Sequence, residues 1–368
     1  AHQFHNRKKN DDRYILAGYP WFKCRARDQF IALPGLTLSI EEQDYFELVM
    51  KTAERVLREF MQNEPLTVEI QEIEQPDVIL CIWAIQQYAK EAGKESCLKL
   101  YGDFLRDMIA YIENGKHPNL FLHTNGLLYA EGKNKAITWM NGMVDGKPVN
   151  PRSGYIVEFN ALWYNDIKFV AWLFSDTSET EYAAHLEEMA SLCKDAFVAT
   201  FLNNYGYLYD YVDGNMVDWS VRPNMILAAA LDYSPLEQSQ KKSVVDICTR
   251  ELLTPKGLRS LSPKSGGYTP VCVGDQDHRT RVYHQGTAWP WLGGFYLEAC
   301  LKLYKRTRLS FVERQLIGYE DEVMNHCLGT IPEYFDGNPP YSGRGAISFA
   351  MNVGEVLRTL ALLEKYKY

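Results

Sequence analysis

The chain lacks the patterns that mark several common classes of protein. Its eight cysteines form no Cys-x-x-Cys pair, and no Cys/His cluster has the spacing of a zinc site. No apolar run approaches the roughly 18 residues that a membrane-spanning helix needs, and the first residues contain no apolar segment of the signal-peptide kind. Free thiols in a reducing, cytoplasmic compartment are the simplest interpretation.

Positive charge is also scarce. Lys and Arg number 39 against 47 Asp and Glu, which leaves a formal net charge of −8 at pH 7. Nucleic acids and anionic membranes favour a basic face, so neither is expected as a partner. The chain has no His-Glu-x-x-His array, no phosphate loop ending in Lys-Ser/Thr and no Gly-x-Ser-x-Gly elbow. A neutral ligand fits best, and no metal or organic cofactor is expected.

Most of the chain has the periodicity of helices. In 40–62, for example, apolar residues recur mostly in steps of three and four. We therefore predict an all-α fold with helices at 28–33, 40–62, 77–92, 95–114, 158–174, 178–202, 223–231, 236–253, 287–304, 310–327 and 347–366. Ser178 and Ser310 are the expected N-caps of two of them. Strand-like alternation is confined to 205–211 and 267–273, which suits hairpins in loops.

The connections between these helices are of two kinds. Short polar links at 91–94 and 305–308 carry no chemistry. The long connections are crowded with Trp, Tyr, Gly, Pro, Asp and Glu, and their place at alternate joints indicates one decorated end of a helical closure. No low-complexity linker divides the chain, so a single domain over 1–368 is expected. An all-helical solenoid is the alternative architecture.

Five segments carry a family likeness. They read AGYPWFKCRARDQFIALPGLTL (17–38), ITWMNGMVDGKPVNPRSGYIVEFNALWYN (137–165), VRPNMILAAAL (221–231), RVYHQGTAWPWLGGFY (281–296) and IPEYFDGNPPYSGRGA (331–346). In content and order the chain resembles the C-terminal amylo-α-1,6-glucosidase domain of glycogen debranching enzymes. The resemblance implies an (α/α)₆ toroid with a sugar site at one end. About eleven of its twelve helices are predicted, so 1–5 is the expected stump of a truncated first helix, and an upstream domain of a longer protein is expected.

The resemblance also implies two catalytic positions. Inverting glycoside hydrolysis uses one carboxyl as general base on water and a second, protonated carboxyl as general acid on the leaving oxygen. Glu333 in IPEYFDG matches the family's base, with an exposed loop glutamate as the alternative. At the acid position the family usually carries Thr-Trp-Met-Asp, and here Asn141 replaces that Asp. An amide has no acidic proton to donate. An engineered change, a natural difference of lineage and a donor from elsewhere are the competing explanations.

Two nearby aspartates are interpreted as turn residues. Asp145 is the carboxyl nearest to Asn141 in the sequence, but Asp-Gly is a turn signal. Asp336 precedes Gly337 in the same way.

Other positions match the family's sugar-binding segments. Arg27-Asp28 resembles the pair that holds the terminal glucose, although Arg25-Ala26 replaces the usual Trp-Gly before it. The alternative for each polar residue is a cap, an ion pair or another structural role, and for each Trp it is core packing. The expected sugar-contacting residues are Arg27, Asp28, Trp139, Glu158, Arg222, His284, Gln285 and Trp289.

Three functions stay open. The leading one is hydrolysis of α-1,6-linked glucose at branch stubs of glycogen or of a branched maltooligosaccharide, with Glu333 and position 141 as the catalytic pair. The second is a non-catalytic glucan-binding module that has lost its acid, which Asn141 motivates. The third is a related inverting barrel that acts on another glucoside, such as trehalose or a mannosyl-oligosaccharide cap.

Overall fold

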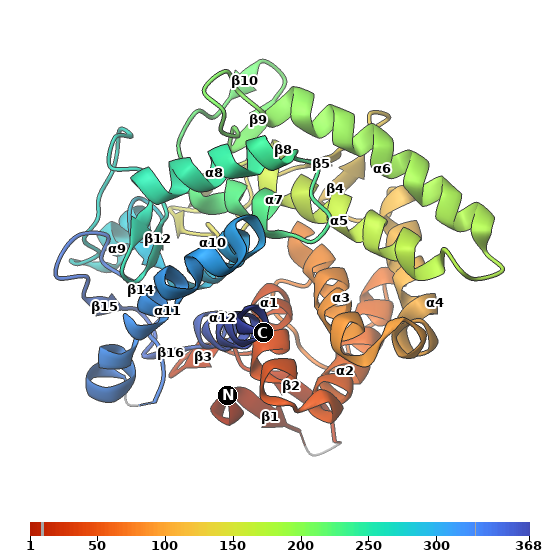
Figure 1. Cartoon of the computed structure of the whole chain (residues 1–368), viewed down its shortest axis with the longest axis horizontal. Coiled ribbons are helices and arrows are strands. Elements are labelled where there is room, and N and C mark those ends of the chain that lie inside the picture. The colour runs from red at the N-terminus through yellow and green to blue at the C-terminus, as the bar shows by residue number, and fades with distance from the viewer. Residues whose placement is uncertain (9–10, 328) are drawn as a thin grey trace.

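A closed cycle of helices organises the chain (Figure 1). The computed structural model describes residues 1–8, 11–327 and 329–368. Six of the described helices each contact the next, and the last contacts the first; they are α1 (Ala26–Leu36), α3 (Leu80–Ala92), α5 (Val157–Phe174), α7 (Ile226–Ala230), α10 (Pro290–Tyr304) and α12 (Ala350–Lys367). Four further helices each pack on one or two of these: α4 (Lys94–Glu113), α6 (Thr180–Phe201), α8 (Gln238–Glu251) and α11 (Leu309–Ile317).

The burial of each helix follows its place in this arrangement. α5 and α10 are buried along almost their whole length, because neighbours cover them on several sides. The outer helices are amphipathic instead. In α2 (Gln43–Met61), the residues Phe46, Val49, Ala53 and Val56 are buried at helical spacing, while most of the intervening positions reach solvent.

Glycine allows α1 and α12 to lie very close together. A Cβ atom at Gly35 would stand 1.8 Å from the carbonyl oxygen of Gly354, and one at Gly354 would stand 2.7 Å from that of Ala32. A side chain at either position would force the two helices apart. This pair closes the cycle between its first and last helices.

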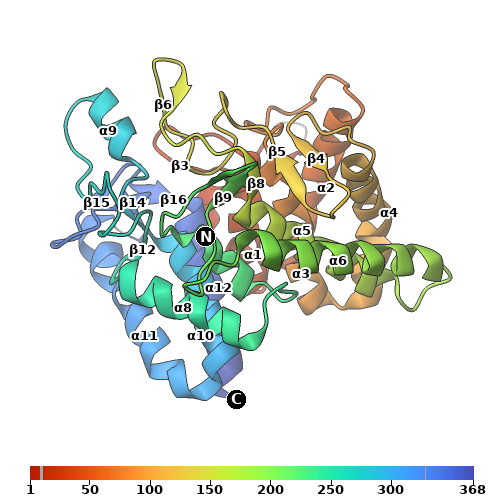
Figure 2. The same ribbon diagram turned by 90° about the horizontal axis from the view of Figure 1, so that it is seen from above.

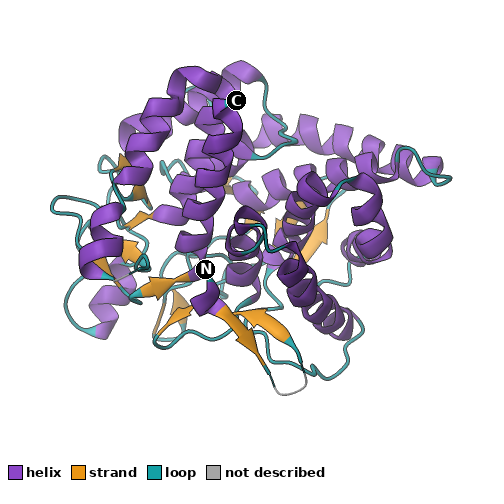
Figure 3. Ribbon diagram, turned by 60° about the horizontal axis from the view of Figure 1, so that its bottom comes forward, coloured by secondary structure: helices purple, strands orange, loops and turns teal. Residues whose placement is uncertain are grey.

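Short strands collect at one end of the helices (Figures 2 and 3). The described strands are β1 (His5–Arg7), β2 (Arg13–Ile15), β3 (Gly18–Tyr19), β4 (Leu120–Leu122), β5 (Leu128–Ala130), β6 (Met143–Val144), β7 (Lys147–Pro148), β8 (Gly154–Ile156), β9 (Tyr211–Asp213), β10 (Met216–Val217), β11 (Leu253–Thr254), β12 (Gly257–Arg259), β13 (Ala288–Trp289), β14 (Tyr334–Phe335), β15 (Gly343–Arg344) and β16 (Ser348–Phe349). They form antiparallel sheets with the orders β10-β9-β8-β5-β4, β11-β12-β13-β14-β15, β1-β2, β16-β3 and β6-β7. β8, β13 and β16 lead directly into α5, α10 and α12. The chain is therefore mainly helical with several small sheets, and the all-α description is too narrow.

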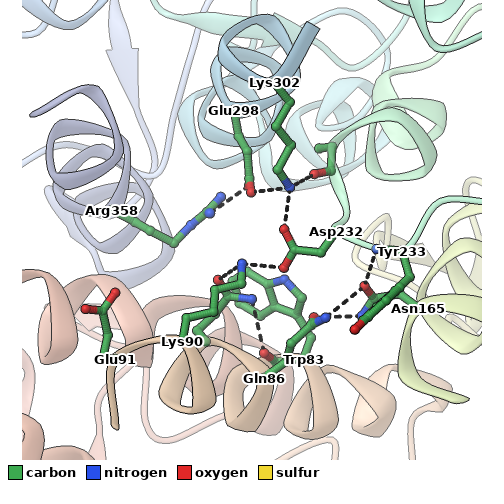
Figure 4. Close-up of polar contacts among 12 residues, drawn as sticks. Trp83, Gln86, Lys90, Glu91, Asn165, Asp232, Tyr233, Glu298, Lys302 and Arg358 are labelled. Atoms are coloured by element: carbon green, nitrogen blue, oxygen red, sulfur yellow. Dashed lines mark hydrogen bonds and ion pairs between the residues drawn. The ribbon is translucent and has the colours of Figure 1, made fainter. Parts of the chain in front are cut away.

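An ionic network ties α3, α10 and α12 of the cycle together (Figure 4); Glu298, Glu355 and Arg358 in it are buried, while Lys90 and Asp232 reach the surface. The Lys302 ammonium of α10 lies 2.8 Å from Asp232 and 2.7 Å from Glu298, and Lys90 of α3 also pairs with Asp232. Arg358 of α12 reaches Glu298 at 2.7 Å and forms a two-bond contact with Glu355. The buried charges of Glu298, Glu355 and Arg358 require their partners, because an unpaired ion in the interior costs several kcal/mol.

Replacing Arg358 by Met should lower the free energy of unfolding by about 3–5 kcal/mol. The buried Glu355 carboxylate then loses its guanidinium partner, and Glu298 keeps only Lys302 of its two cationic partners. Lys365→Met on the same helix is the matched control. Lys365 pairs with Glu91 at the surface, so its loss should cost about 1 kcal/mol or less. Urea unfolding of both variants measures the difference. Equal losses would show that the network contributes no more than a surface ion pair.

The sequence predicted the positions of the helices well but did not predict the residues at which they begin. All eleven predicted segments contain a helix, but both predicted N-caps are wrong. α6 begins at Thr180 rather than after Ser178, because the Thr177 hydroxyl already accepts the Glu179 N–H at 3.1 Å. α11 follows directly from a 3₁₀ turn at Lys305–Arg308, so Ser310 faces no free helix start.

The strand predictions fared worse. The stretch 205–211 is mostly turn and bend, but its Leu208 forms a single antiparallel bridge with Leu202, and β9 starts at its last residue. No described residue of 267–273 lies in a strand. This stretch is a loop whose Thr269 N–H donates to the Gln285 carbonyl at 2.6 Å and whose Cys272 N–H donates to Asp336 at 3.1 Å. All eight cysteines are free and buried, as predicted, and no helix among the described residues is long and apolar enough to cross a bilayer.

Candidate active site

A cavity of about 980 Å³ lies among the connections that precede helices of the cycle. It is lined by Trp21, Phe22, Arg25, Glu72, Asn141, Gly142, Met143, Cys272, Val273, Gly274, Gln276, Arg279, Thr280, Tyr283, Glu333, Tyr334, Arg344 and Gly345. Both predicted catalytic positions, Glu333 and Asn141, are among them. Residues almost two hundred positions apart in the sequence therefore line one ligand-sized hollow.

Glu333 is fixed in the cavity wall by two donors. Its Oε2 accepts the N–H of Ala346 at 2.9 Å, and its Oε1 accepts the hydroxyl of Tyr283 in a short contact. The neighbouring Gly345 makes this possible: its φ is +72°, and a Cβ there would stand 2.3 Å from Oε2 of Glu333. The carboxyl is thus held in one orientation while it lines the cavity.

The surroundings of Glu333 shift its pKa. Burial raises the pKa of Glu333 to about 8, while the Ala346 N–H and the charge of Arg25 act in the opposite direction. A carboxyl with such a pKa changes its protonation state near neutral pH. That property suits a group that takes up or releases a proton during a reaction.

Position 141 is next to a carboxylate that the sequence did not single out. The Asn141 amide donates to Oε1 of Glu72 at 3.4 Å. Oε2 of Glu72 accepts from Arg27 at 3.1 Å, and Arg25 lies 3.8 Å from Oε1. Burial acts to raise the pKa of Glu72, but the two guanidinium groups outweigh it and hold the pKa below its usual value. Glu72 is therefore ionised at neutral pH.

The backbone brings Glu72 to this place. Gln71 forms an isolated parallel bridge with Arg25, in which the Gln71 N–H donates to the Cys24 carbonyl and the Ala26 N–H donates to the Gln71 carbonyl, both at 3.0 Å. Glu72 then adopts a left-handed conformation with φ +59°. Such a conformation is costly for a residue with a side chain, and strained residues of this kind cluster at functional sites.

Arg27 and Asp28 lie just beneath the cavity wall. Arg27 binds three carboxylates, at 3.1 Å from Asp28, 3.1 Å from Glu72 and 3.2 Å from Asp77. Burial raises the pKa of Asp28, and it raises the pKa of Asp77 to about 7, although Arg27 opposes both shifts. Arg27 thus orients Glu72. Neither Arg27 nor Asp28 lines the cavity itself, so their contact with a glucose stays a prediction.

The predicted aromatic residues form a buried layer behind the wall. Trp139 packs edge-on against His284 and Trp289, with ring centres 5.0 and 5.1 Å apart, and its indole N–H donates to Asn224 at 2.7 Å. Trp289 in turn stacks on Tyr334, which does line the cavity. Burial lowers the pKa of His284 well below its usual value, so its ring is neutral. Sugar contacts by Trp139, His284 and Trp289 stay predictions.

The remaining predicted residues are engaged in polar contacts of their own. Glu158 forms a buried ion pair with Arg152, in which Nη2 of Arg152 donates to Oε2 at 2.7 Å. Arg222 donates to the carbonyl of His284 at 2.9 Å and to the side chain of Gln285 at 3.0 Å. These contacts anchor the loops around the cavity, and sugar contact by Glu158, Arg222 and Gln285 stays a prediction.

The two aspartates differ from each other. Asp145 occupies the two-residue turn between β6 and β7, with positive φ at both Asp145 and Gly146, which confirms the turn interpretation. Asp336 is instead held by Arg344 through both carboxylate oxygens and also accepts the Cys272 N–H. Its carboxylate joins two cavity-lining segments, which the turn interpretation did not anticipate.

Comparison with known proteins shows which family the chain belongs to. The family model described as amylo-alpha-1,6-glucosidase matches residues 1–358. The chain belongs to this family. A glycogen debranching enzyme of Saccharomyces cerevisiae is 26% identical over 227 residues; the match covers 49% of this chain and 15% of the yeast protein.

Solved structures with the same fold lie further away in sequence. An uncharacterized conserved protein from Thermus thermophilus superimposes with a TM-score of 0.65 at 12% identity, covering 96% of both chains. A GH63 mannosylglycerate hydrolase from the same organism, in complex with glucose, gives a TM-score of 0.64 at 12% identity and covers 94% of this chain and 95% of its own. At such identity the likeness shows the fold alone.

Three cavity residues of this amylo-alpha-1,6-glucosidase family member were missed as site residues. Glu72 lies outside all five family-like segments, and its left-handed backbone has no sequence signature. Tyr283 directly precedes His284 in RVYHQGTAWPW, so its place in that segment was an available signal. Arg25 was noted only as a departure from the family pattern, yet it lies in the wall beside Glu72.

Proposed function

We propose that the cavity hydrolyses terminal α-1,6-linked glucose from glycogen branch stubs, with inversion at the anomeric carbon. The observation that carries this proposal is that Glu333 and position 141 line the same cavity. Inverting glycosidases place their two catalytic groups on either side of the scissile bond and leave room for a water. Family membership and the similarity to the yeast debranching enzyme support a glucan as substrate.

We also propose that the whole domain has a toroidal architecture. The cycle of six helices and the helices packed on it correspond to an (α/α)₆ toroid that forms one domain. The expected helix stump at 1–5 is a 3₁₀ turn at His2–Phe4 followed by the start of β1. The domain works beside an upstream domain in the cytoplasm. The free, buried cysteines support a reducing compartment.

Glu333 acts in this reaction as the general base. As a carboxylate it takes a proton from a water that attacks the anomeric carbon, while Tyr283 and the Ala346 N–H hold its oxygens in place. Asn141 supplies hydrogen bonds but no acidic proton to the leaving oxygen. The chemical step on a branch glucoside is therefore slow in this chain.

A glucan-binding module is the second candidate, and Asn141 is the observation that favours it. Glucose release from 6-O-α-glucosyl maltotriose and affinity for the same sugar, measured on one preparation, separate the two functions. Release above the uncatalysed rate supports the hydrolase. Binding without release, either from this substrate or from α-D-glucosyl fluoride, supports the module. Faster hydrolysis of trehalose than of the branched sugar would support a different glucoside as substrate.

The pKa of Glu333 predicts the pH dependence of kcat/KM. A general base works when it is deprotonated, so with a pKa of about 8 the rate on α-D-glucosyl fluoride should rise about tenfold per pH unit below this value and level off above it. Fluoride leaves without a proton, so no acid group distorts the profile. A rate that falls through pH 8 would mean that protonated Glu333 is the active form.

A further inference from the structure

The part of the cavity wall around position 141 has no carboxylic proton to give. Among the described residues that line the cavity, the carboxyl groups belong to Glu72 and Glu333. Glu72 is bound to Arg27 at 3.1 Å and lies close to Arg25, which keeps it as an anion. Asn141 is an amide. A sugar alkoxide is a strong base and leaves readily only when it is protonated, so this wall is poorly suited to an ordinary glycosidic oxygen.

The same wall presents a guanidinium group instead. Oε1 of Glu72 is shared: the Asn141 amide nitrogen lies 3.4 Å from it and Nη2 of Arg25 lies 3.8 Å from it. Arg25 is therefore next to the position from which a leaving group would receive its proton. Its other carboxylate neighbour, Asp28, is 3.9 Å away, which is longer than a hydrogen bond.

The donors of Arg25 are not committed to those carboxylates. Both ion pairs exceed hydrogen-bond distance, and within the described part of the chain its Nε has no hydrogen-bond partner. The guanidinium packs 4.5 Å from the centre of the Phe22 ring, which holds it at the cavity edge. A fork of N–H donors in this state matches the oxygens of a carboxylate or phosphate.

A second guanidinium adds to the positive charge. Arg279 donates to the Gln276 side chain at 2.8 Å and to a backbone carbonyl, both neutral groups, and it forms no ion pair with any described residue. Arg344 is different, because Asp336 neutralises it. The chain as a whole carries a formal charge of −8. A cavity lined by Arg279 and by Arg25, whose ion pairs with Glu72 and Asp28 are longer than hydrogen bonds, is therefore a local feature.

We propose that this site cleaves sugars whose anomeric carbon is esterified to a carboxylate or a phosphate, with Arg25 binding the departing anion in place of a proton donor. The inference rests on the proposed function, because it keeps Glu333 as the base, and it adds the chemical class of the leaving group. A weakly basic oxyanion departs without protonation, so the missing acid is no handicap for such substrates.

The reaction balances without a further reactant. The oxygen of water forms a bond to the anomeric carbon as the bond from that carbon to the ester oxygen breaks. The electron pair of the broken bond leaves on the carboxylate or phosphate, which Arg25 and Arg279 stabilise. One proton of the water passes to Glu333 and then to solvent. The products are the sugar with inverted configuration and the free anion.

The test compares four probes on the full chain: α-D-glucosyl fluoride, α-D-glucose 1-phosphate, 1-O-benzoyl-α-D-glucose and 6-O-α-glucosyl maltotriose. We expect hydrolysis of the fluoride and of at least one ester, at kcat/KM values about 100-fold or more above that of the branched sugar. The ester that is hydrolysed distinguishes a phosphate from a carboxylate as the preferred anionic leaving group. Arg25→Gln should lower the ester rate about tenfold or more relative to the fluoride rate. Arg281→Gln is the control, because Arg281 lies outside the cavity lining and pairs with Asp145.

The outcomes separate this inference from the proposed function. Fluoride hydrolysis that depends on Glu333, together with inert esters, would overturn the inference and leave the hydrolase intact. An unchanged ratio of ester to fluoride rates in Arg25→Gln would also overturn it. Hydrolysis of no probe, or fluoride hydrolysis that survives Glu333→Gln, would remove the proposed function and the inference together.

Discussion

Asn141→Asp should raise glucose release from 6-O-α-glucosyl maltotriose by about 100-fold or more, because a general acid contributes roughly 10²–10⁴ to the rate of such a reaction. The structure adds a reason to expect a competent acid. Glu72 holds its Oε1 3.4 Å from the amide nitrogen of Asn141. A new carboxyl beside this anion would have its pKa raised, since two neighbouring carboxyls resist being charged together. It would therefore keep its proton at neutral pH.

Two control variants and a second substrate test whether the gain in rate comes from the acid role of residue 141. Asn204→Asp adds the same charge at an exposed turn and should leave the rate unchanged. In the double variant Asn141→Asp with Glu72→Gln, the pKa of the introduced carboxyl is lower and the gain in the rate at neutral pH is smaller. The α-D-glucosyl fluoride rate should rise far less than the branched-sugar rate, because fluoride needs no proton. Equal gains on both substrates would argue against position 141 as the acid position.

Glu333→Gln should lower kcat for α-D-glucosyl fluoride by about 100-fold to 10,000-fold, the range for loss of a general base. The amide preserves the shape of the side chain but cannot take a proton from water. Glu320→Gln, at an exposed position, is the control for loss of one negative charge. A Glu333→Gln variant with more than about a tenth of the parent rate would exclude Glu333 as the base.

Glu333→Gln should also change how the stability of the folded chain depends on pH. The pKa of Glu333 in the folded chain, about 8, lies above the ordinary value near 4.5. The folded state therefore binds this proton more tightly than the unfolded state does, and stability contributed by the proton is full below the ordinary pKa and decreases as the pH rises towards 8. Glu333→Gln does not lose stability in this way, because its amide does not titrate in this range. Its melting temperature should exceed that of the parent increasingly between about pH 5 and pH 9.

The sequence was most informative about features that depend on local spacing. The buried face of α2 follows from the intervals between its apolar residues, and α2 and α5 were both predicted to within a few residues. Family-like motifs located Glu333 and Asn141, which the structure then places in one cavity. Their proposed roles still await experiment.

Features that depend on distant parts of the chain could not be predicted in this way. Glu72 reaches position 141 through a bridge between Gln71 and Arg25, a pairing of only one residue on each side that leaves no alternation in the sequence. The strands could not be predicted for the same reason. The described strands are two or three residues long, which is too short to show an alternation of apolar and polar residues in the sequence. The burial of Trp139 and Trp289 is a further example: Trp289 packs against Tyr283 and Tyr334, and Trp139 packs against Trp289, which spacing in the sequence does not reveal.

The most direct test is a crystal structure of the Glu333→Gln variant with bound 6-O-α-glucosyl maltotriose. We predict that the terminal glucose lies in the cavity, with the side chain of residue 333 on one side of its anomeric carbon and Asn141 within hydrogen-bond distance of the glycosidic oxygen on the other. A glucose bound elsewhere, or one whose anomeric carbon contacts neither side chain, would contradict the assignment of this cavity as the active site.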